Sequence, residues 1–184
     1  MKYYILIIVL IFSVMLIADK PAAKVTEPDS TEIAEDSAVL QAHRFFAADF
    51  FNKCWDLIDK KNRTPDEDLQ MIHLAHASRA HWEAVGNPVN HAVGEWQISR
   101  VYAILNRPQE ALYYAQACLN ICQKNNITGF NLGFAYEALA RTEFLLGNVA
   151  KADEYIALGK KAAVEVEIVE DREYLLGDLN SIKK

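Results

Sequence analysis

Cysteine, proline and glycine are all scarce in this sequence. The 184 residues include three Cys, five Pro and seven Gly. Three cysteines cannot form the disulfide framework of a small secreted domain, and an odd number leaves at least one thiol unpaired within the chain. The low proline and glycine content excludes collagen-like and low-complexity proteins. The length fits one ordinary domain with an additional segment.

Positive charge is also in deficit. The chain has 19 Lys and Arg against 25 Asp and Glu, which gives a formal net charge of −6 at pH 7. Because nucleic-acid-binding domains normally carry a basic face, this balance argues against a nucleic-acid partner. No complete catalytic signature appears in the chain, and no pattern in it indicates a cofactor. We therefore expect a protein that is not an enzyme.

One long apolar run is present, at the N-terminus. Residues 3–18 contain Ser13 as their only small polar residue, and Lys2 precedes them. These residues would reach about 24 Å as a helix, less than the ~30 Å hydrocarbon core of a bilayer. This pattern is typical of an export signal, but no good cleavage site follows it. We therefore assign residues 1–23 to a signal peptide or an N-terminal membrane anchor, with a buried core helix as a third interpretation.

This leader predicts a protein that is exported, or tethered to the membrane through residues 1–18. A periplasmic or cell-surface location follows from it. The alternative is a cytoplasmic protein whose start codon is mis-assigned. Residues 24–36 are acidic and hold almost no large apolar side chains. Such a segment cannot offset its ordering entropy by burial, so we expect a flexible linker.

Residues 37–184 form the predicted domain, which we expect to be all-α. Apolar residues recur three and four positions apart, and no strand pattern appears. Thr64 to Glu67 predict a helix start with a capping box, and Asn87 with Pro88 predicts another start. Gly86 is expected to end the preceding helix in a left-handed conformation. About seven helices result, and connections this short force neighbouring helices to run antiparallel.

An internal repeat is visible at an offset of 41 residues. Residues 98–106 align with residues 139–147, and Ala111 aligns with Ala152. Each unit is a helix, a tight turn at Asn or Gly, and a second helix with a small residue near its start. This pattern resembles the tetratricopeptide repeat. The matching positions are Ile98, Ser99, Tyr102, Asn106, Ala111, Cys118 and Leu119, then Leu139, Ala140, Gly147, Ala152 and Gly159.

A second resemblance concerns three helical segments, residues 74–82, 94–102 and 134–141. They are similar to segments of a group of bacterial helical-repeat proteins of unknown function, which implies a fold and no activity. Both resemblances imply helical hairpins stacked as a short α-solenoid. In the tetratricopeptide layout, the first helix of each hairpin lines a concave groove. The resemblance then implies seven groove residues: His73, His76, Glu83, Trp96, Arg100, Glu137 and Arg141.

These groove residues lead to our main functional hypothesis, a non-catalytic scaffold that binds a protein or peptide ligand. Arg100 and Arg141 could clamp a carboxylate through bidentate hydrogen bonds. The alternative is a ladder of internal ion pairs with Glu95 and Glu137. Trp96 is either a hot spot for a partner or an ordinary core aromatic residue.

Two other hypotheses remain open. The first is a small metal-dependent helical hydrolase in which His73, His76 and Glu83 hold Zn²⁺ with an open coordination position. Their spacing is not that of the metalloprotease motif, so two groove or capping histidines are the simpler interpretation. The second is a homo-oligomer that assembles through a terminal hairpin. The other histidines, His43, His81 and His91, are expected to be structural or surface residues.

Overall fold

A computed structural model describes the backbone of residues 30–182 and the side chains of residues 36–182. Over this range the chain forms seven α-helices and no strand, which confirms the predicted all-α class. The helices are α1 (Ser30–Ile58), α2 (Pro65–Val85), α3 (Pro88–Ile104), α4 (Pro108–Lys124), α5 (Gly129–Leu145), α6 (Val149–Ala163) and α7 (Val169–Ser181). The predicted N-terminal apolar helix lies outside the described residues.

The two predicted helix starts are confirmed in atomic detail. The Thr64 hydroxyl accepts a hydrogen bond from the backbone N–H of Glu67, and the Glu67 carboxylate accepts one from the backbone N–H of Thr64. Asn87 and Asn90 form the same reciprocal pair at the start of α3. Each capping residue is followed by a proline in the first turn, where a missing N–H has no cost.

The end of α2 differs from the sequence prediction. Gly86 has φ −83° and ψ 174°, which is extended backbone and not the left-handed conformation. Its N–H donates to the carbonyl oxygen of Trp82, and a Cβ at Gly86 would lie 2.6 Å from that oxygen. Glycine is therefore required for close approach. The extended backbone leads directly into Asn87, which already caps α3.

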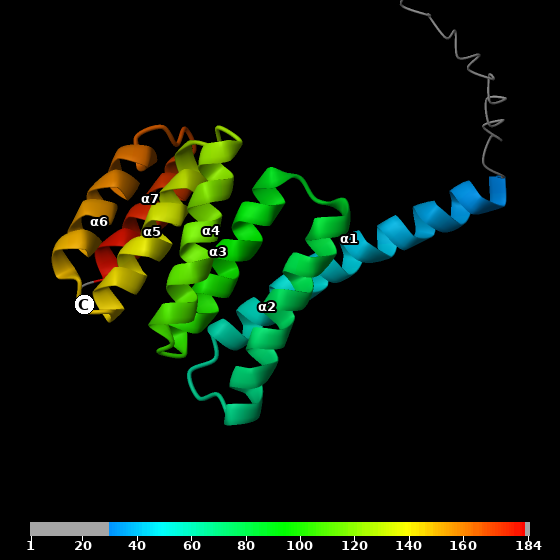
Figure 1. Ribbon diagram of the computed structural model, residues 1–184, viewed down its shortest axis with the longest axis horizontal. Helices are drawn as coiled ribbons and strands as arrows, with labels where there is room; N and C mark the ends of the chain where they lie inside the picture. Colours follow the sequence, from blue (N-terminus) through cyan, green and yellow to red (C-terminus); the bar gives the residue numbers. More distant parts are fainter. Residues whose placement is uncertain (1–29, 183–184) are drawn as a thin grey trace, which may run out of the picture.

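The 41-residue repeat is also a repeat of structure. Asn106 and Gly147 both adopt positive φ, 53° and 82°, at the turns that end α3 and α5. Ala111 and Ala152 are both fully buried where α4 and α6 pack on these helices. The hairpin of α3 and α4 and the hairpin of α5 and α6 are thus equivalent units, packed side by side (Figure 1).

The stack has an inner and an outer row of helices. The odd-numbered helices contact one another in order, α1 with α3, α3 with α5 and α5 with α7. Within the described part of the chain, the even-numbered helices make no such contacts with each other. Because successive odd-numbered helices contact each other and successive even-numbered helices do not, the odd-numbered row is the more closely spaced one. The odd-numbered helices therefore line the inner face of the stack.

Helix α7 closes the stack by packing on α5 and α6. Its Leu175 and Leu179 are buried. A Cβ at Gly133 of α5 would lie 2.3 Å from Leu175, and one at Gly159 of α6 would lie 2.8 Å from Leu179. Two glycines therefore allow α7 to approach closely.

The N-terminal end of α1 projects from the rest of the domain (Figure 1). This helix has 29 residues against 21 in α2, and it begins at Ser30. The segment predicted as a flexible linker, residues 24–36, is therefore helical from Ser30 onward, and its earlier residues lie outside the described range. None of the helices between residues 30 and 182 has the length and hydropathy required to cross a bilayer.

Candidate functional site

Four of the seven predicted groove residues meet in one polar cluster on the inner face. The Glu137 side chain of α5 is only 1% exposed. Its carboxylate accepts hydrogen bonds from Trp96 Nε1 at 3.3 Å, from Arg100 Nη1 at 2.9 Å and from Arg141 Nε at 2.6 Å. Two arginines and one indole thus share a single buried carboxylate.

Helix α7 supplies the second carboxylate of this cluster. Arg100 Nη2 donates to both carboxylate oxygens of Asp178, at 3.0 and 3.2 Å. Arg141 Nη2 donates to the backbone oxygen of Asp178 and to Ser181 Oγ. Burial alone would lower the pKa of Arg100, but Glu137 and Asp178 outweigh it and raise the pKa. The cluster is a closed network of two cations and two anions.

This network changes the interpretation of the two arginines. Arg100 pairs with Glu137 and Asp178, and Arg141 pairs with Glu137, so the internal ion-pair alternative describes them better than the carboxylate clamp. Glu95, which was also expected in the ladder, forms its ion pair with Arg79 of α2 at 2.8 Å.

The other three predicted groove residues, His73, His76 and Glu83, lie on α2 in the outer row. His76 Nε2 lies 3.1 Å from the hydroxyl of Tyr102, and Glu83 accepts a hydrogen bond from Arg79 at 2.6 Å. Among the residues that the structure describes, no three His, Cys, Asp or Glu side chains come together as a metal site would require. The three residues therefore do not form the site that the metal-dependent hydrolase needs.

The environment of His76 predicts a pH dependence of stability. Burial lowers the pKa of His76, and the charge of His73 lowers it further. In the unfolded chain a histidine titrates near pH 6.5. As the pH falls through this range, the unfolded state binds more protons than the folded state, so the free energy of unfolding decreases.

In urea unfolding at pH 7.5 and 5.5, we expect His76→Gln to lose less stability than the parent chain. His73→Gln removes the second cause of this shift and should give a loss between those of the parent and His76→Gln, and equal losses for parent and His76→Gln would contradict the expectation.

The remaining histidines have partners that sequence analysis did not find. His43 Nδ1 lies 3.1 Å from His81 Nδ1, which joins α1 to α2. His91 Nε2 lies 3.0 Å from the carbonyl oxygen of Trp82. These contacts fit the structural role that was expected for all three.

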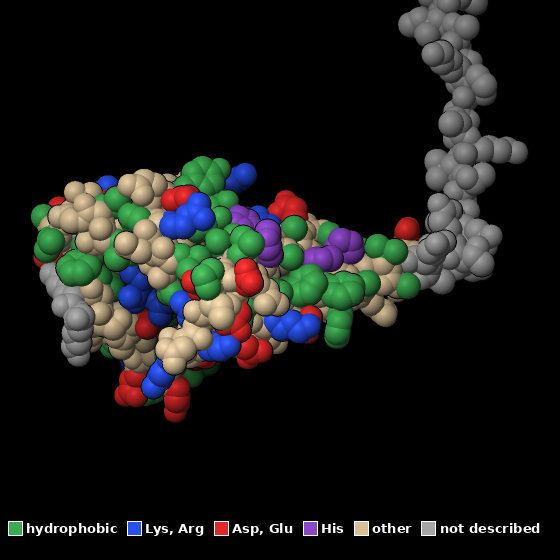
Figure 2. All heavy atoms as spheres, turned by 90° about the horizontal axis from the view of Figure 1, so that it is seen from below, with side chains coloured by type: hydrophobic (Ala, Val, Ile, Leu, Met, Phe, Trp, Pro, Cys, Tyr) green, Lys and Arg blue, Asp and Glu red, His purple; other side chains and the backbone are tan. Residues whose placement is uncertain are grey.

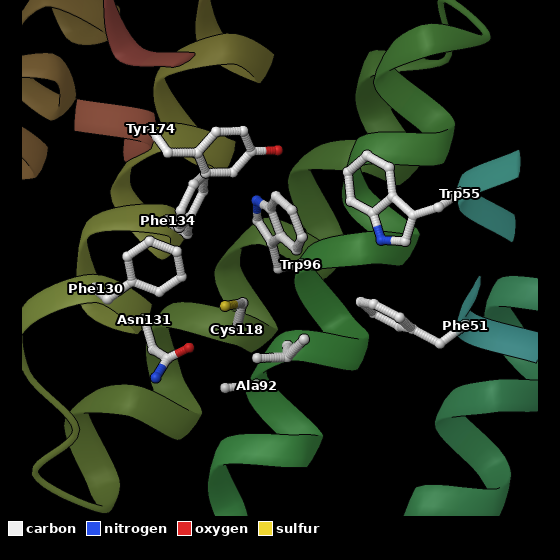
Figure 3. Close-up of a pocket in the computed structure, with 10 residues that line it drawn as sticks. Phe51, Trp55, Ala92, Trp96, Cys118, Phe130, Asn131, Phe134 and Tyr174 are labelled. Carbon is white, nitrogen blue, oxygen red and sulfur yellow. The ribbon is translucent and has the colours of Figure 1, made fainter. Parts of the chain in front are cut away.

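A second feature of the inner face is an apolar pocket of about 280 Å³ beside the polar cluster. Figure 3 shows its side chains, which come from α1 on one side and from α3, α4, α5 and α7 on the other. Six of its lining residues are aromatic: Phe51, Trp55, Trp96, Phe130, Phe134 and Tyr174. Trp96 joins the two features, because its ring lines the pocket and its Nε1 binds Glu137.

The rings of the pocket support one another. The centroid of Trp96 lies 5.6 Å from that of Trp55 and 4.9 Å from that of Phe134, and Phe130 lies 4.8 Å from Phe134. Edge-to-face and tilted contacts of this kind hold aromatic side chains in fixed positions. The pocket is therefore a preformed apolar surface.

Two polar groups lie at this pocket. Asn131 lines it, and its side-chain amide makes no hydrogen bond with any described residue. Burial raises the pKa of Tyr174, and Asp178 raises it further, so its hydroxyl remains a neutral hydrogen-bond donor. Both groups can therefore bind a polar atom of a ligand.

Sequence analysis missed most of the pocket, although the repeat contains its signal. Two series run along the chain at intervals of 41 residues: Trp55, Trp96, Glu137 and Asp178, and Phe51, Ala92, Gly133 and Tyr174. Each series has one member on each of α1, α3, α5 and α7. The expected groove took α2 as the first helix of a hairpin, whereas the 41-residue register assigns that position to α1.

Comparisons of this chain with protein-family models, with curated proteins and with solved structures give no match. The resemblance to tetratricopeptide repeats therefore rests on residue spacing and on the stacked helical hairpins.

Proposed function

We propose that this protein is a non-catalytic, tetratricopeptide-like scaffold that binds a peptide segment of a partner protein on its inner face. One observation carries this proposal, namely the aromatic pocket of about 280 Å³ formed by rings from α1, α3, α5 and α7. Aromatic side chains gathered around a central pocket are the usual anchors of protein interfaces. The predicted leader would place such a scaffold at or beyond the membrane.

The size of the pocket favours one large side chain of a partner. Sites for cofactors and other small molecules usually enclose ~300–1,000 Å³, and this pocket lies just below that range. Its lining offers no ready nucleophile either. A hydrogen bond with Cys122 and burial raise the pKa of Cys118, so this thiol stays protonated. Binding therefore fits the pocket better than catalysis does.

The chemistry of the lining defines the expected ligand. An apolar or aromatic side chain would fill the pocket, because almost all of the lining is hydrophobic. The amide of Asn131 and the hydroxyl of Tyr174 could then bind the peptide backbone on either side of this anchor. The arginines contribute no free charge, since Glu137 and Asp178 already neutralise them.

Filling the pocket should abolish peptide binding without unfolding the domain. Asn131→Phe adds a ring at a half-buried position and removes no hydrogen bond within the described chain. Peptides of random sequence would be selected by phage display on the parent protein, and their affinities measured by the change in tryptophan fluorescence, to which Trp55 and Trp96 of the pocket contribute. We expect selected peptides to share an apolar or aromatic residue, and Asn131→Phe to bind them at least about tenfold more weakly, or ~1.4 kcal/mol.

The matched control is Gln123→Phe, which adds the same ring to an exposed position of α4 away from the pocket. It should bind the selected peptides as the parent does. Thermal unfolding of both variants shows whether the domain is intact. If Asn131→Phe retains the parent affinity, the peptides bind elsewhere and the pocket is not the site.

A further inference from the structure

The buried stripe of α1 continues into the part of the helix that no other helix covers. Leu40, Ala47 and Cys54 are spaced seven residues apart, so they share one face of α1. Ala47 and Cys54 are fully buried, whereas Leu40 is 47% exposed. The difference arises because α1 extends past the helices that cover its later turns (Figure 1).

Exposed apolar side chains are concentrated in this same stretch of α1. Val39, Phe45 and Phe46 accompany Leu40, and Phe45 is 64% exposed. Figure 2 shows hydrophobic side chains along the projecting end of the helix, next to histidines. At about 100° per residue, Val39, Phe45 and Phe46 lie on other faces of α1, so Leu40 alone continues the buried face, and its exposure there leaves room for another molecule.

The charges beside Leu40 indicate which molecule this is. Asp36 and Arg44 stand four residues before and four residues after Leu40, so the three residues follow one line along the helix. Both charged residues are exposed, and neither forms an ion pair with any described residue. Turning such a surface by 180° about its apolar centre exchanges its acidic and basic ends. The acid of one copy then faces the base of the other, so the surface is complementary to itself.

We infer that this surface binds the same surface of a second copy of the chain, with the two α1 helices antiparallel and a twofold axis at Leu40. Leu40 then meets Leu40 of the other copy, and Asp36 of each chain faces Arg44 of the other. A parallel pair would instead place Asp36 beside Asp36 and Arg44 beside Arg44, which is repulsive. Twofold interfaces of this kind are the commonest in soluble homo-oligomers.

The pairing surface is separate from the aromatic pocket. The pocket residues Phe51 and Trp55 follow Leu40 by about three turns of α1 or more. A contact between two helices is small beside the ~1,600 Å² of a standard interface, so the dimer should dissociate on dilution. Dimerisation and peptide binding can therefore be tested independently.

A disulfide can report this pairing directly in the full chain. Leu40→Cys places one thiol at the twofold axis, and the three native cysteines are buried. On mild oxidation we expect covalent dimers on a non-reducing gel. The matched control is Ala42→Cys, an exposed position on the opposite face of α1, which should yield at least about fivefold less dimer.

Charge exchange then tests the geometry. In the Leu40→Cys chain, Arg44→Glu sets acid against acid on both sides of the axis and should reduce the dimer yield about fivefold or more. The double change Asp36→Lys with Arg44→Glu restores opposite charges and should recover the yield. A mixture of chains carrying Asp36→Lys or Arg44→Glu alone should form mixed dimers in preference to either homodimer.

Three outcomes would overturn this inference. Equal dimer yields from Leu40→Cys and Ala42→Cys would show only random collision. Dimers that are insensitive to charge exchange would exclude the antiparallel pairing at Leu40. A monomeric Leu40→Cys variant whose introduced thiol resists a thiol reagent would show that residues 1–29 of its own chain cover the surface. Circular dichroism of each variant establishes that the helices are intact.

Discussion

Replacing Glu137 by alanine should lower the free energy of unfolding by about 3–5 kcal/mol, since it removes one partner of a buried ion-pair network. The Glu137 carboxylate accepts hydrogen bonds from Trp96, Arg100 and Arg141. Without it, Arg100 would keep the carboxylate of Asp178, whereas Arg141 would keep only the backbone oxygen of Asp178 and Ser181 Oγ, with no acidic partner among the described residues. Urea unfolding at neutral pH, followed by circular dichroism, measures the loss.

The matched control for Glu137→Ala is Glu83→Ala, which removes an exposed carboxylate from an ion pair with Arg79. Exposed pairs contribute little because water and salt screen them, so the control should be far less destabilised. Similar losses for the two variants would contradict a stabilising role for the buried network. In the Glu137→Ala background, Arg141→Ala should lower the free energy of unfolding by less than it does in the parent chain, because it then removes an unpaired charge.

The second large effect is expected in α7. Leu175→Ala should lower the free energy of unfolding by about 2–5 kcal/mol, since it leaves a cavity in a closely packed interior. Leu175 is fully buried and packs directly on Gly133 of α5. The same helix supplies Tyr174 to the pocket and Asp178 to the polar cluster, so its loosening would disturb both.

Leu176→Ala is the matched control, because it removes the same atoms from a half-buried neighbour on α7. Leu176→Ala should lower the free energy of unfolding by less than Leu175→Ala does. Hydrogen exchange of the α7 amides should accelerate more in Leu175→Ala than in Leu176→Ala. Equal costs for the two variants would indicate that α7 is not packed on Gly133 as the structure shows.

The sequence by itself determined the helices and their order. Caps such as Thr64 and Asn87 act through hydrogen bonds to residues two or three positions away, so a local pattern is sufficient to predict them. The 41-residue repeat also indicated equivalent hairpins, and Asn106 and Gly147 adopt the same left-handed turn. The prediction for Gly86 was wrong because its conformation depends on the helix that follows it.

The partners across the inner face were decided only by the tertiary structure. Arg100 binds Asp178, which lies 78 residues further along the chain, and His43 meets His81 across 38 residues. Hydrophobic periodicity fixes which face of a helix is buried, but it does not fix which neighbour that face meets or how far the helices rotate against each other. Those quantities depend on how the hairpins stack, and they set the contacts of Glu137 and the ring positions that form the aromatic pocket.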